Sequence, residues 1–292
     1  MSSVAIILLN WNNYADTMDC IRSLEAINYP DYHIIVADNG SSDGSVVAIS
    51  EAFPNVTLVE NGKNLGFAAG NNVGIRLALK GAYDYVLLLN NDTVVDPCFL
   101  RAMVATADAD PAIGIVGPKI YYYDDPKRIW FAGGHVNHWL GETSHVGQNE
   151  LDDGRYDVIK DTDFITGCAL LIKRKALEEI GLLDERMGFY FEDNDLCARA
   201  RKRGYRIVYV PEAKIWHKVA SSAGKVNDLQ LFYFTRNRLI FMRRYASRFQ
   251  FAVFLPYYVL RYVVLKLAVA LIQLKLDQAK LILRAVYEGA TT

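Results

Sequence analysis

The chain has 292 residues, of which 52% are hydrophobic, so it can bury a sizeable core as one large domain or two small ones. Its formal net charge of −1 excludes the strongly basic surface typical of nucleic-acid-binding proteins, and no nucleic-acid partner is expected. The four cysteines are scattered without a CxxC pair, which argues against a zinc site or disulfide framework and favours a reducing compartment. No secretory signal is expected, because no basic segment with an apolar stretch and cleavage site precedes the first apolar run.

The first 120 residues alternate between short apolar runs and helical patterns. The apolar runs lie at residues 4–9, 33–37, 56–59 and 86–89, and the helical patterns at 16–26, after Ser42-Asp43, at 67–79 and at 97–107. This alternation predicts βαβ units with right-handed crossovers. The expected fold class is therefore α/β, with a Rossmann-like, mostly parallel central sheet flanked by helices.

The middle of the chain is less regular. Residues 121–160 hold Tyr, Trp, Gly, His and Asp without clear periodicity, and loops and short strands over one side of the sheet are expected there. A strand at 169–173, helices at 175–180 and 192–203, and short strands at 206–210 and 213–216 are expected to follow. These elements would complete a first domain of residues 1–225, with halves 1–120 and 121–225.

The C-terminal segment, residues 226–292, differs in composition. Residues 228–288 are rich in Leu, Val, Phe, Tyr, Arg and Lys, and charged positions from Lys266 to Glu288 recur at helical spacing. The longest uncharged run, residues 249–260, is shorter than the roughly 20 residues that a spanning helix needs. An amphipathic helix pair at an anionic membrane surface is predicted; the alternative is a pair buried against the first domain or in a homodimer.

Two arginines of the C-terminal segment, Arg236 and Arg238, flank Asn237. They could reach a phosphate of a substrate, and the alternative is a solvated helix face.

Polar residues follow each of the first four apolar runs. The first ends in Asn10-Trp11-Asn12, the second in Asp38-Asn39-Gly40, the third leads to Asn64-Leu65-Gly66 and onward to Asn71, and the fourth ends in Asn90-Asn91-Asp92. A turn alone would explain any one of these, since turns prefer Asn, Asp and Gly. Four together favour a ligand site at the carboxyl edge of one sheet.

The carboxylate of Asp92, with amides beside it, can hold a hard cation and the sugar-phosphate end of a nucleotide. The alternative is that Asp92 only caps the helix expected near Pro97. The chain has neither GxGxxG nor GxxxxGK[ST], so dinucleotide binding and P-loop binding are not indicated.

Paired acids lie among aromatic residues at Glu192 and Asp193, just before a predicted helix. They either provide the negative charge that helix N-termini favour or include a general base in a partly dry pocket. Asp193 and Asp195 cannot face the same site from one helix, so different roles are expected. His217 ends a predicted strand; it is either a structural histidine or a ligand that completes a metal shell begun by Asp92.

These motifs together resemble the family-two glycosyltransferases of the GT-A fold, especially the branch that includes rhamnosyltransferases. The matching pieces occur in family order over residues 4–245 and are Leu8-Leu9-Asn10-Trp11-Asn12, Val36–Ser45, Asn64–Asn71, Leu87–Thr93, Thr166-Gly167-Cys168-Ala169, Glu192–Leu196 and Trp216-His217. The resemblance implies inverting transfer of a sugar from a nucleoside-diphosphate sugar to an acceptor hydroxyl, with residues 1–120 as the nucleotide-binding half and 121–225 as the acceptor and catalytic half.

The resemblance also implies roles for individual residues. Asp193 would be the catalytic base, and Asp92 and His217 would hold Mg²⁺ or Mn²⁺ on the diphosphate. Asp38 would contact the base, where its carboxylate suits an N–H of uracil or thymine. Further contacts to the nucleotide are expected from Asn10, Asn12, Asn64, Gly66, Asn71 and Asn90. The family usually begins its DxD triplet with a carboxylate, and Asn90 departs from this pattern, so direct metal ligation by Asn90 is in doubt.

The donor-sugar or acceptor pocket is expected to include Trp130, Gly167 and Glu192. The expected reaction moves rhamnose or a hexose onto a glycan or lipid-linked glycan in cell-surface polysaccharide synthesis, in the cytoplasm at the inner face of the membrane. The amide at Asn90 leaves a second hypothesis open, a non-catalytic module that binds nucleotide sugar. A nucleotidyltransferase would need a glycine-rich, basic first loop, and here that loop is Asn-Trp-Asn-Asn.

Overall fold

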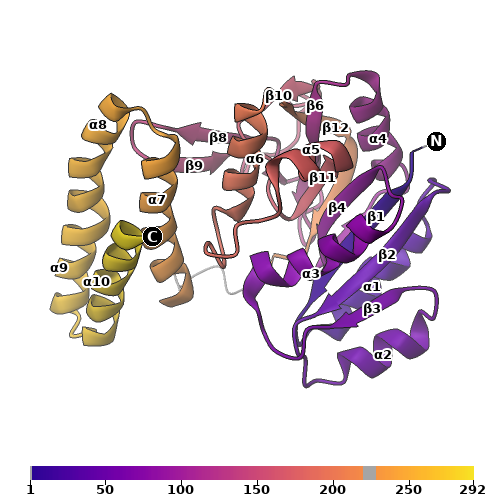
Figure 1. Ribbon diagram of the computed structural model, residues 1–292, viewed down its shortest axis with the longest axis horizontal. Helices are drawn as coiled ribbons and strands as arrows, with labels where there is room; N and C mark the ends of the chain where they lie inside the picture. Colours follow the sequence, from indigo (N-terminus) through magenta and orange to yellow (C-terminus); the bar gives the residue numbers. More distant parts are fainter. Residues whose placement is uncertain (1, 220–227) are drawn as a thin grey trace. The chain divides into compact units, whose positions relative to one another are not determined.

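The computed structural model describes residues 2–219 and 228–292, which divide into two compact units. The sheet unit contains residues 2–134, 145–188 and 192–219. The helical unit contains residues 135–144, 189–191 and the described C-terminal residues from 228 onward. Figure 1 shows the sheet with its helices and, separately, the bundle of C-terminal helices.

The sheet unit is built on one sheet with the strand order β10-β12-β6-β11-β4-β1-β2-β3, to which β5 and β7 add at β12 and β6. Its strands are β1 (Val4–Asn10), β2 (Tyr32–Asp38), β3 (Thr57–Glu60), β4 (Tyr85–Asn90), β5 (Thr93–Val95), β6 (Ile113–Tyr122), β7 (Ile129–Phe131), β10 (Lys160–Asp161), β11 (Ala169–Lys173) and β12 (Arg206–His217). β4, β1, β2 and β3 run parallel, and β11 lies antiparallel between β4 and β6. The α/β fold with a central sheet is confirmed, and the sheet is mixed beyond β4.

Helices flank this sheet: α1 (Tyr14–Glu25), α2 (Ser45–Ala52), α3 (Gly66–Lys80), α4 (Phe99–Ala109), α5 (Arg174–Ile180) and α6 (Glu192–Lys202). Helix α3 approaches β1 closely because two of its residues lack side chains. A Cβ at Gly74 would lie 2.6 Å from Cγ2 of Ile7, and one at Gly70 would lie 2.6 Å from Cδ1 of Leu9. The two glycines thus bring the first turns of α3 close to the carboxyl end of β1.

The last strand differs from the sequence prediction. We predicted two short strands at 206–210 and 213–216, but β12 is one continuous strand whose pairing with β6 shifts between Val210 and Lys214. Pro211 lies within the shift. Because proline has no N–H to donate to the ladder, it is tolerated at such an irregularity rather than in regular pairing. The strand therefore continues past Pro211 and brings His217 to the carboxyl edge of the sheet.

The helical unit contains α7 (Asp228–Tyr245), α8 (Arg248–Tyr258), the π-helical stretch η1 (Val259–Val264), α9 (Leu265–Ile272) and α10 (Leu276–Thr291), besides most of the β8 (Gly134–Asn137) and β9 (Glu142–His145) pair. α8, η1 and α9 form one helix, Arg248–Ile272, which begins at a capping box between Ser247 and Gln250. This helix has 25 residues and an 18-residue window of mean hydropathy 1.7, so by length and composition alone it could cross a membrane. The uninterrupted helix is longer than the uncharged run suggested, because it continues through Pro256 and Arg261.

The helical unit also corrects the expectation for Arg236 and Arg238. The alternative of a solvated helix face is wrong, because each residue is only 8% exposed. The arginines lie against aromatic rings of the same unit, with the guanidinium of Arg238 3.8 Å from the ring centroid of Tyr262.

Candidate active site

The register of the parallel strands places the polar strand ends next to one another. Asn10 at the end of β1 is opposite Asp38 at the end of β2, and Leu9 is opposite Asn90 at the end of β4. Parallel strands that end at the same level place the side chains that follow them along one edge. The carboxyl edge of β4, β1 and β2 is therefore the polar edge that the sequence indicated.

Asp38 is held by its own loop and by the neighbouring strand. Its Oδ2 accepts hydrogen bonds from Nδ2 of Asn10 at 2.8 Å and from the hydroxyl of Ser41 at 2.6 Å, and its Oδ1 accepts from the N–H of Ser41 at 2.8 Å. Both Asp38 and Asn10 are buried, with at most 1% exposed. In this arrangement the Asp38 carboxylate already fixes the loop that would surround a nucleotide.

The loops after β1 and β2 are also joined to each other through Asn12. Its N–H donates to the Ser41 hydroxyl at 2.9 Å, and its Oδ1 accepts from the N–H of Ser42 at 2.8 Å. Asn12 has a positive φ of 49°, which asparagine tolerates better than most residues. Next to it, Trp11 is 54% exposed. An exposed aromatic ring on a fixed loop can stack on a base.

The third polar segment connects to the second through Asn39, a residue that we did not select from the sequence. Nδ2 of Asn39 donates to the carbonyl of Gly66 at 3.1 Å and to Oδ1 of Asn64 at 3.3 Å. Asn64 Oδ1 also accepts from the N–H of Gly66 at 2.8 Å, at the start of α3. The side chain of Asn71 instead donates to the carbonyl of Phe67 within that helix. The sequence feature that could have identified Asn39 is its position directly after Asp38.

The turn after β4 is tied to the elements around it. The N–H of Asn90 donates to the carbonyl of Cys168 at 2.8 Å, and its carbonyl accepts from the hydroxyl of Thr93 at 2.8 Å. Nδ2 of Asn91 donates to the hydroxyl of Thr17 at 2.7 Å, and that hydroxyl donates to Oδ1 of Asn10. These bonds join the turn to the end of β1 and leave Asp92 at its tip.

Asp92 faces His217, with 3.0 Å between Oδ1 of Asp92 and Nε2 of His217. The pairing of β5 with β12 causes this contact, because Thr93 is opposite His217 in the register. The alternative that Asp92 caps the next helix is wrong, since α4 begins at Phe99 and Asp96 accepts the hydrogen bond from the N–H of Cys98.

The surroundings of His217 are dry and charged. Burial by itself lowers the pKa of His217, but interactions with Cys168 and with the Asp92 carboxylate outweigh burial and raise the pKa to about 10. The indole of Trp130 lies edge-on to the imidazole, with 4.7 Å between the ring centroids, and edge-on to His145 at 4.6 Å. Trp130 is thus placed beside the Asp92–His217 pair.

Asp92 and His217 fit a divalent cation. Oδ1 of Asp92 has no hydrogen bond of normal geometry among the described residues, and the atom that faces it is Nε2 of His217 at 3.0 Å, so a cation would lie between these two atoms. A carboxylate oxygen and a neutral imidazole nitrogen are ligands that Mn²⁺ accepts, and carboxylates also suit Mg²⁺, so binding would displace the proton that the raised pKa of His217 favours. No group of three metal-ligating side chains occurs in the described part of the chain. A bound cation would therefore need further ligands from diphosphate oxygens and water.

Asp193, at the start of α6, is oriented by three donors. Its Oδ2 accepts from the N–H of Gly167 at 2.9 Å, and its Oδ1 accepts from the N–H and Nδ2 of Asn194, both at 2.7 Å. Gly167 lies close to Phe67, since a Cβ there would be 3.1 Å from the ring. Burial raises the pKa of Asp193, and the hydrogen bonds to its ionised form oppose that rise.

The two carboxyl groups beside Asp193 have different environments. Glu192 is 6% exposed with Oε2 unpartnered among described residues, and burial together with the charge of Asp193 raises its pKa well above the usual value. Glu192 is thereby favoured in its neutral form. Asp195 pairs with Arg199 at 2.8 Å, so it differs in role from Asp193, as its helix position predicted.

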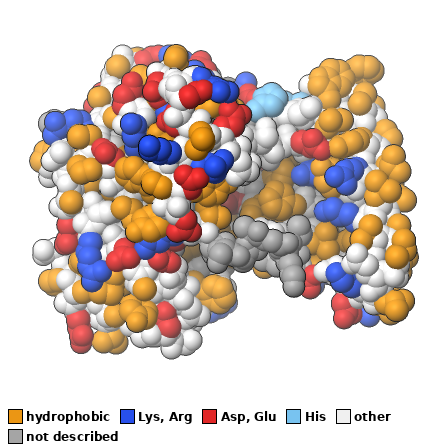
Figure 2. All heavy atoms as spheres, turned by 180° about the vertical axis from the view of Figure 1, so that it is seen from behind, with side chains coloured by type: hydrophobic (Ala, Val, Ile, Leu, Met, Phe, Trp, Pro, Cys, Tyr) orange, Lys and Arg blue, Asp and Glu red, His pale blue; other side chains and the backbone are white. Residues whose placement is uncertain are grey.

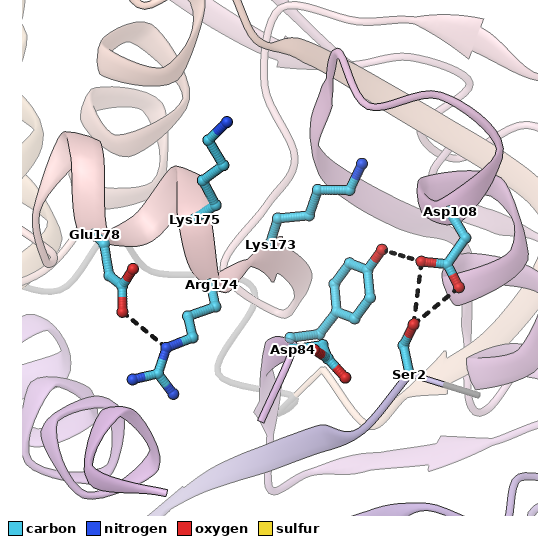
Figure 3. A pocket seen from close by; sticks show the side chains of 8 residues that line it. Ser2, Asp84, Asp108, Lys173, Arg174, Lys175 and Glu178 are labelled. Atoms are coloured by element: carbon cyan, nitrogen blue, oxygen red, sulfur yellow. Dashed lines mark hydrogen bonds and ion pairs between the residues drawn. The ribbon is translucent and has the colours of Figure 1, made fainter. Parts of the chain in front are cut away.

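A cavity of about 360 Å³ lies at the opposite, amino edge of β1 and β4 (Figure 3). Three of its charged side chains have partners in its lining: Arg174 pairs with Glu178, and Asp108 accepts from the hydroxyls of Ser2 and Tyr85. The polar strand ends do not line this cavity, so the carboxyl edge remains the candidate active site.

Comparison with known proteins assigns the chain to a family. The family model described as Glycosyl transferase family 2 matches residues 3–181. The chain belongs to this family. An N-acetylglucosaminyl-diphospho-decaprenol L-rhamnosyltransferase of Mycobacterium tuberculosis is 31% identical over 215 residues, which cover 66% of this chain and 68% of the relative. A poly-beta-1,6-N-acetyl-D-glucosamine synthase of Staphylococcus aureus is 26% identical over 77% of this chain and 52% of the relative.

Solved glycosyltransferase structures share the fold. A mannosyltransferase from Pyrobaculum calidifontis in complex with GDP-Man and Mn²⁺ has a TM-score of 0.61 at 17% identity, over 100% of this chain and 76% of that one. GalNAc-T7 with UDP, GalNAc and Mn²⁺ also has a TM-score of 0.61, at 15% identity over 74% of this chain and 43% of that one. The resemblance seen in the sequence motifs is confirmed, and this family-two chain is a glycosyltransferase.

Proposed function

We propose that this glycosyltransferase moves rhamnose or a hexose from a nucleoside-diphosphate sugar to a hydroxyl of a glycan or lipid-linked glycan, with inversion at the anomeric carbon. The names of two relatives support this proposal, since one transfers rhamnose to a sugar on a diphospho-lipid and the other makes a polysaccharide. The product would serve cell-surface polysaccharide synthesis. The reaction would occur in the cytoplasm, with the enzyme peripheral on the inner face of the membrane.

The carboxyl edge of the sheet would bind the nucleotide. Asn10 and Asp38 would act at the base and ribose together with the loop that they fix, and Asn12, Asn64, Gly66, Asn71 and Asn90 would shape the rest of the pocket. A divalent cation, Mg²⁺ or Mn²⁺, held by Asp92 and His217 would neutralise the negative charge that grows on the departing diphosphate. Trp130 lies edge-on to His217, which supports a place for its ring beside the donor sugar.

Asp193 would remove the proton of the acceptor hydroxyl. The observation that carries this role is the difference between two adjacent carboxyl groups: Asp193 is oriented by Gly167 and Asn194, whereas Glu192 is unpartnered, buried and favoured as the neutral acid. Of the two, Asp193 is therefore the group placed to act as an ionised base. In a single displacement, the deprotonated hydroxyl attacks the face opposite the diphosphate, which inverts the configuration.

The substitution Asp193→Asn tests this role. It should lower kcat by about 10²–10⁴-fold, the usual contribution of a general base, while the dissociation constant of the nucleotide changes little. Glu192→Gln is the matched control, because it replaces a neutral acid with a neutral amide of the same shape and should retain most of the activity. Normal turnover of Asp193→Asn would remove Asp193 from the mechanism.

A non-catalytic binding module is the second candidate, and Asn90 is the observation that favours it, because one carboxylate of the usual triplet is missing. Titration calorimetry of the nucleotide with and without Mn²⁺, followed by a donor-hydrolysis assay, separates the two functions. A module would bind the nucleotide and leave the donor intact, whereas an enzyme would also release nucleoside diphosphate.

The helical unit supports the proposal of peripheral membrane binding. Large apolar side chains along η1, α9 and the turn after them are exposed, among them Leu260 at 58% and Ile272 at 82%. Arg261 and Lys266 interrupt the centre of the same helix, which disfavours a spanning position. The same surface could instead serve a homodimer, in which case the protein would be dimeric in solution and would not bind vesicles.

A further inference from the structure

A pocket of about 260 Å³ lies inside the helical unit, bounded by α7, η1, α9 and α10. Its walls are apolar and include Leu231, Val269 and Ile282. Its polar groups are the cations Arg261 and Lys266 and the amide of Gln278. A pocket with apolar walls and a few converging polar groups is the usual form of a small-ligand site.

The cations of this pocket lack acidic partners. Neither Arg261 nor Lys266 forms an ion pair with any residue that the structure describes. Arg238 lies close by, 92% buried, and its Nε and Nη1 have no hydrogen-bond partner among described residues. Arg238 does not line the pocket, but its guanidinium adds a buried positive charge near Lys266 that these two atoms do not share with a described acceptor.

Arg238, Arg261 and Lys266 all lie within about 6 Å of the ring centroid of Tyr262. The ring centroid is 3.8 Å from Arg238, 5.3 Å from Nζ of Lys266 and 5.9 Å from Arg261. The hydroxyl of Tyr262 donates to Glu142, the carboxylate of the cluster. Three positive charges against one negative charge leave an excess of about two positive charges, which complements a phosphate group.

The pKa of Lys266 reflects repulsion among these cations. Burial, and then the charges of Arg238 and Arg261, lower the pKa of its ammonium group to about 8. An anion between these groups would relieve the repulsion.

The outer surface of the same helices is apolar. Val264, Leu265 and Val269 are 46–52% exposed, and Leu265 and Val269 also line the pocket. Figure 2 shows apolar side chains along the helical unit with Lys and Arg side chains among them. The positive pocket is therefore continuous with a surface that suits a hydrocarbon chain.

We propose that the pocket between α7, η1, α9 and α10 binds the phosphate headgroup of a membrane lipid, with Lys266 and Arg261 on the phosphate and the lipid chain along the exposed apolar face. The inference rests on the proposed membrane association and adds to it a specific headgroup site. Arg238, which does not line the pocket, adds a third positive charge on the same Tyr262 ring. A free phosphate would satisfy the cations but would gain nothing from the apolar walls, so the lipid is the occupant that uses both features.

Sedimentation of the full-length protein with lipid vesicles tests the proposal. The vesicles are phosphatidylcholine alone, or phosphatidylcholine with phosphatidic acid, and no nucleotide sugar is present. Lys266→Gln should weaken binding to the phosphatidic acid vesicles by about tenfold or more, since a hydrogen bond to a charged group contributes about 1.5–3 kcal/mol. Lys275→Gln is the matched control: it removes the same charge from an exposed lysine outside the pocket, and binding should change by no more than about fivefold, the effect of one cation near an anionic surface.

Three results would overturn the proposal. Equal losses for Lys266→Gln and Lys275→Gln would show binding by overall charge. Equal binding to both vesicle types would show that the excess positive charge of the pocket does not select an anionic phosphate headgroup over the zwitterionic one of phosphatidylcholine. Calorimetric binding of inorganic phosphate without lipid, lost in Lys266→Gln, would assign the pocket to a soluble anion. Lys266→Arg retains the charge and should bind as the wild type, which separates loss of the contact from loss of the fold. Because no donor is present, the outcome is independent of sugar transfer.

Discussion

Asn90 and Asp92 occupy the two ends of the triplet that follows β4, and the structure gives them unequal surroundings. Oδ1 of Asp92 is buried and faces Nε2 of His217 at 3.0 Å, whereas the backbone of Asn90 is hydrogen-bonded to Cys168 and Thr93. The metal proposal therefore depends on Asp92 at the residue scale. The amide of Asn90 can bond a hydroxyl without adding charge.

The variant Asp92→Asn should lower kcat/KM by about 100-fold or more, because a cation on the diphosphate contributes several kcal/mol to stabilising the transition state. Steady-state kinetics across a Mn²⁺ titration would measure this loss. Asp96→Asn is the matched control, since the Asp96 carboxylate accepts from the N–H of Cys98 in the turn before α4, and this variant should leave the Mn²⁺ dependence unchanged. An unaltered Mn²⁺ dependence in Asp92→Asn would contradict the assignment.

The raised pKa of Asp193 predicts a pH dependence. The base works in its ionised form, so activity is lost as pH falls through its pKa, and a raised pKa moves that loss above the range of an ordinary aspartate. The profile of kcat/KM against pH should show this acidic limb. Glu192→Gln should leave the limb in place because Glu192 is already neutral, and a limb at the ordinary aspartate value would refute the prediction.

At the scale of elements, the strand ends were predictable because each apolar run stops at Asn, Asp or Gly, and parallel pairing brings such ends together. The course of β12 was not predictable, because its passage through Pro211 depends on pairing with β6, nearly one hundred residues earlier in the chain. The burial of Arg236 and Arg238 was missed for a similar reason, since Glu288 and Tyr262, which contact them, lie far from them in the sequence. These features depend on contacts between segments that lie far apart in the sequence, so local sequence patterns do not predict them.

The close approach of α3 to β1 leads to a stability prediction. Helix propensity alone would make Gly74→Ala stabilising by up to about 1 kcal/mol. The added Cβ would lie 2.6 Å from Ile7, however, and overpacking of this kind costs about 1–3 kcal/mol. We expect a net loss of stability, measured as a lower midpoint of urea unfolding. A higher midpoint would show that α3 can move away from β1 without cost.

For the whole molecule, the proposed function requires the active site to reach an acceptor that is held in a membrane. The sheet unit would bind the donor with its polar loops, and the helical unit carries the exposed apolar side chains and the cations Arg261 and Lys266, which form no ion pair with a described residue. A long helix with these properties either lies in the interface or spans the bilayer. The charges at the centre of the helix favour the interfacial position. Each Arg or Lys at the middle of a spanning helix raises the free energy of membrane insertion by about 2.5–3.5 kcal/mol.

An interfacial helix should be released from cell membranes by alkaline carbonate, and immunoblotting of supernatant and pellet would measure this. Arg261 and Lys266 near the middle of Arg248–Ile272 are the reason for expecting release. The double variant Arg261→Leu and Lys266→Leu removes that cost and should shift the protein toward the pellet. Arg248→Leu is the control at the end of the helix, where a charge can reach the interface and its loss should change little. Wild-type protein that resists carbonate as fully as the double variant would show that the helix crosses the membrane despite its charges.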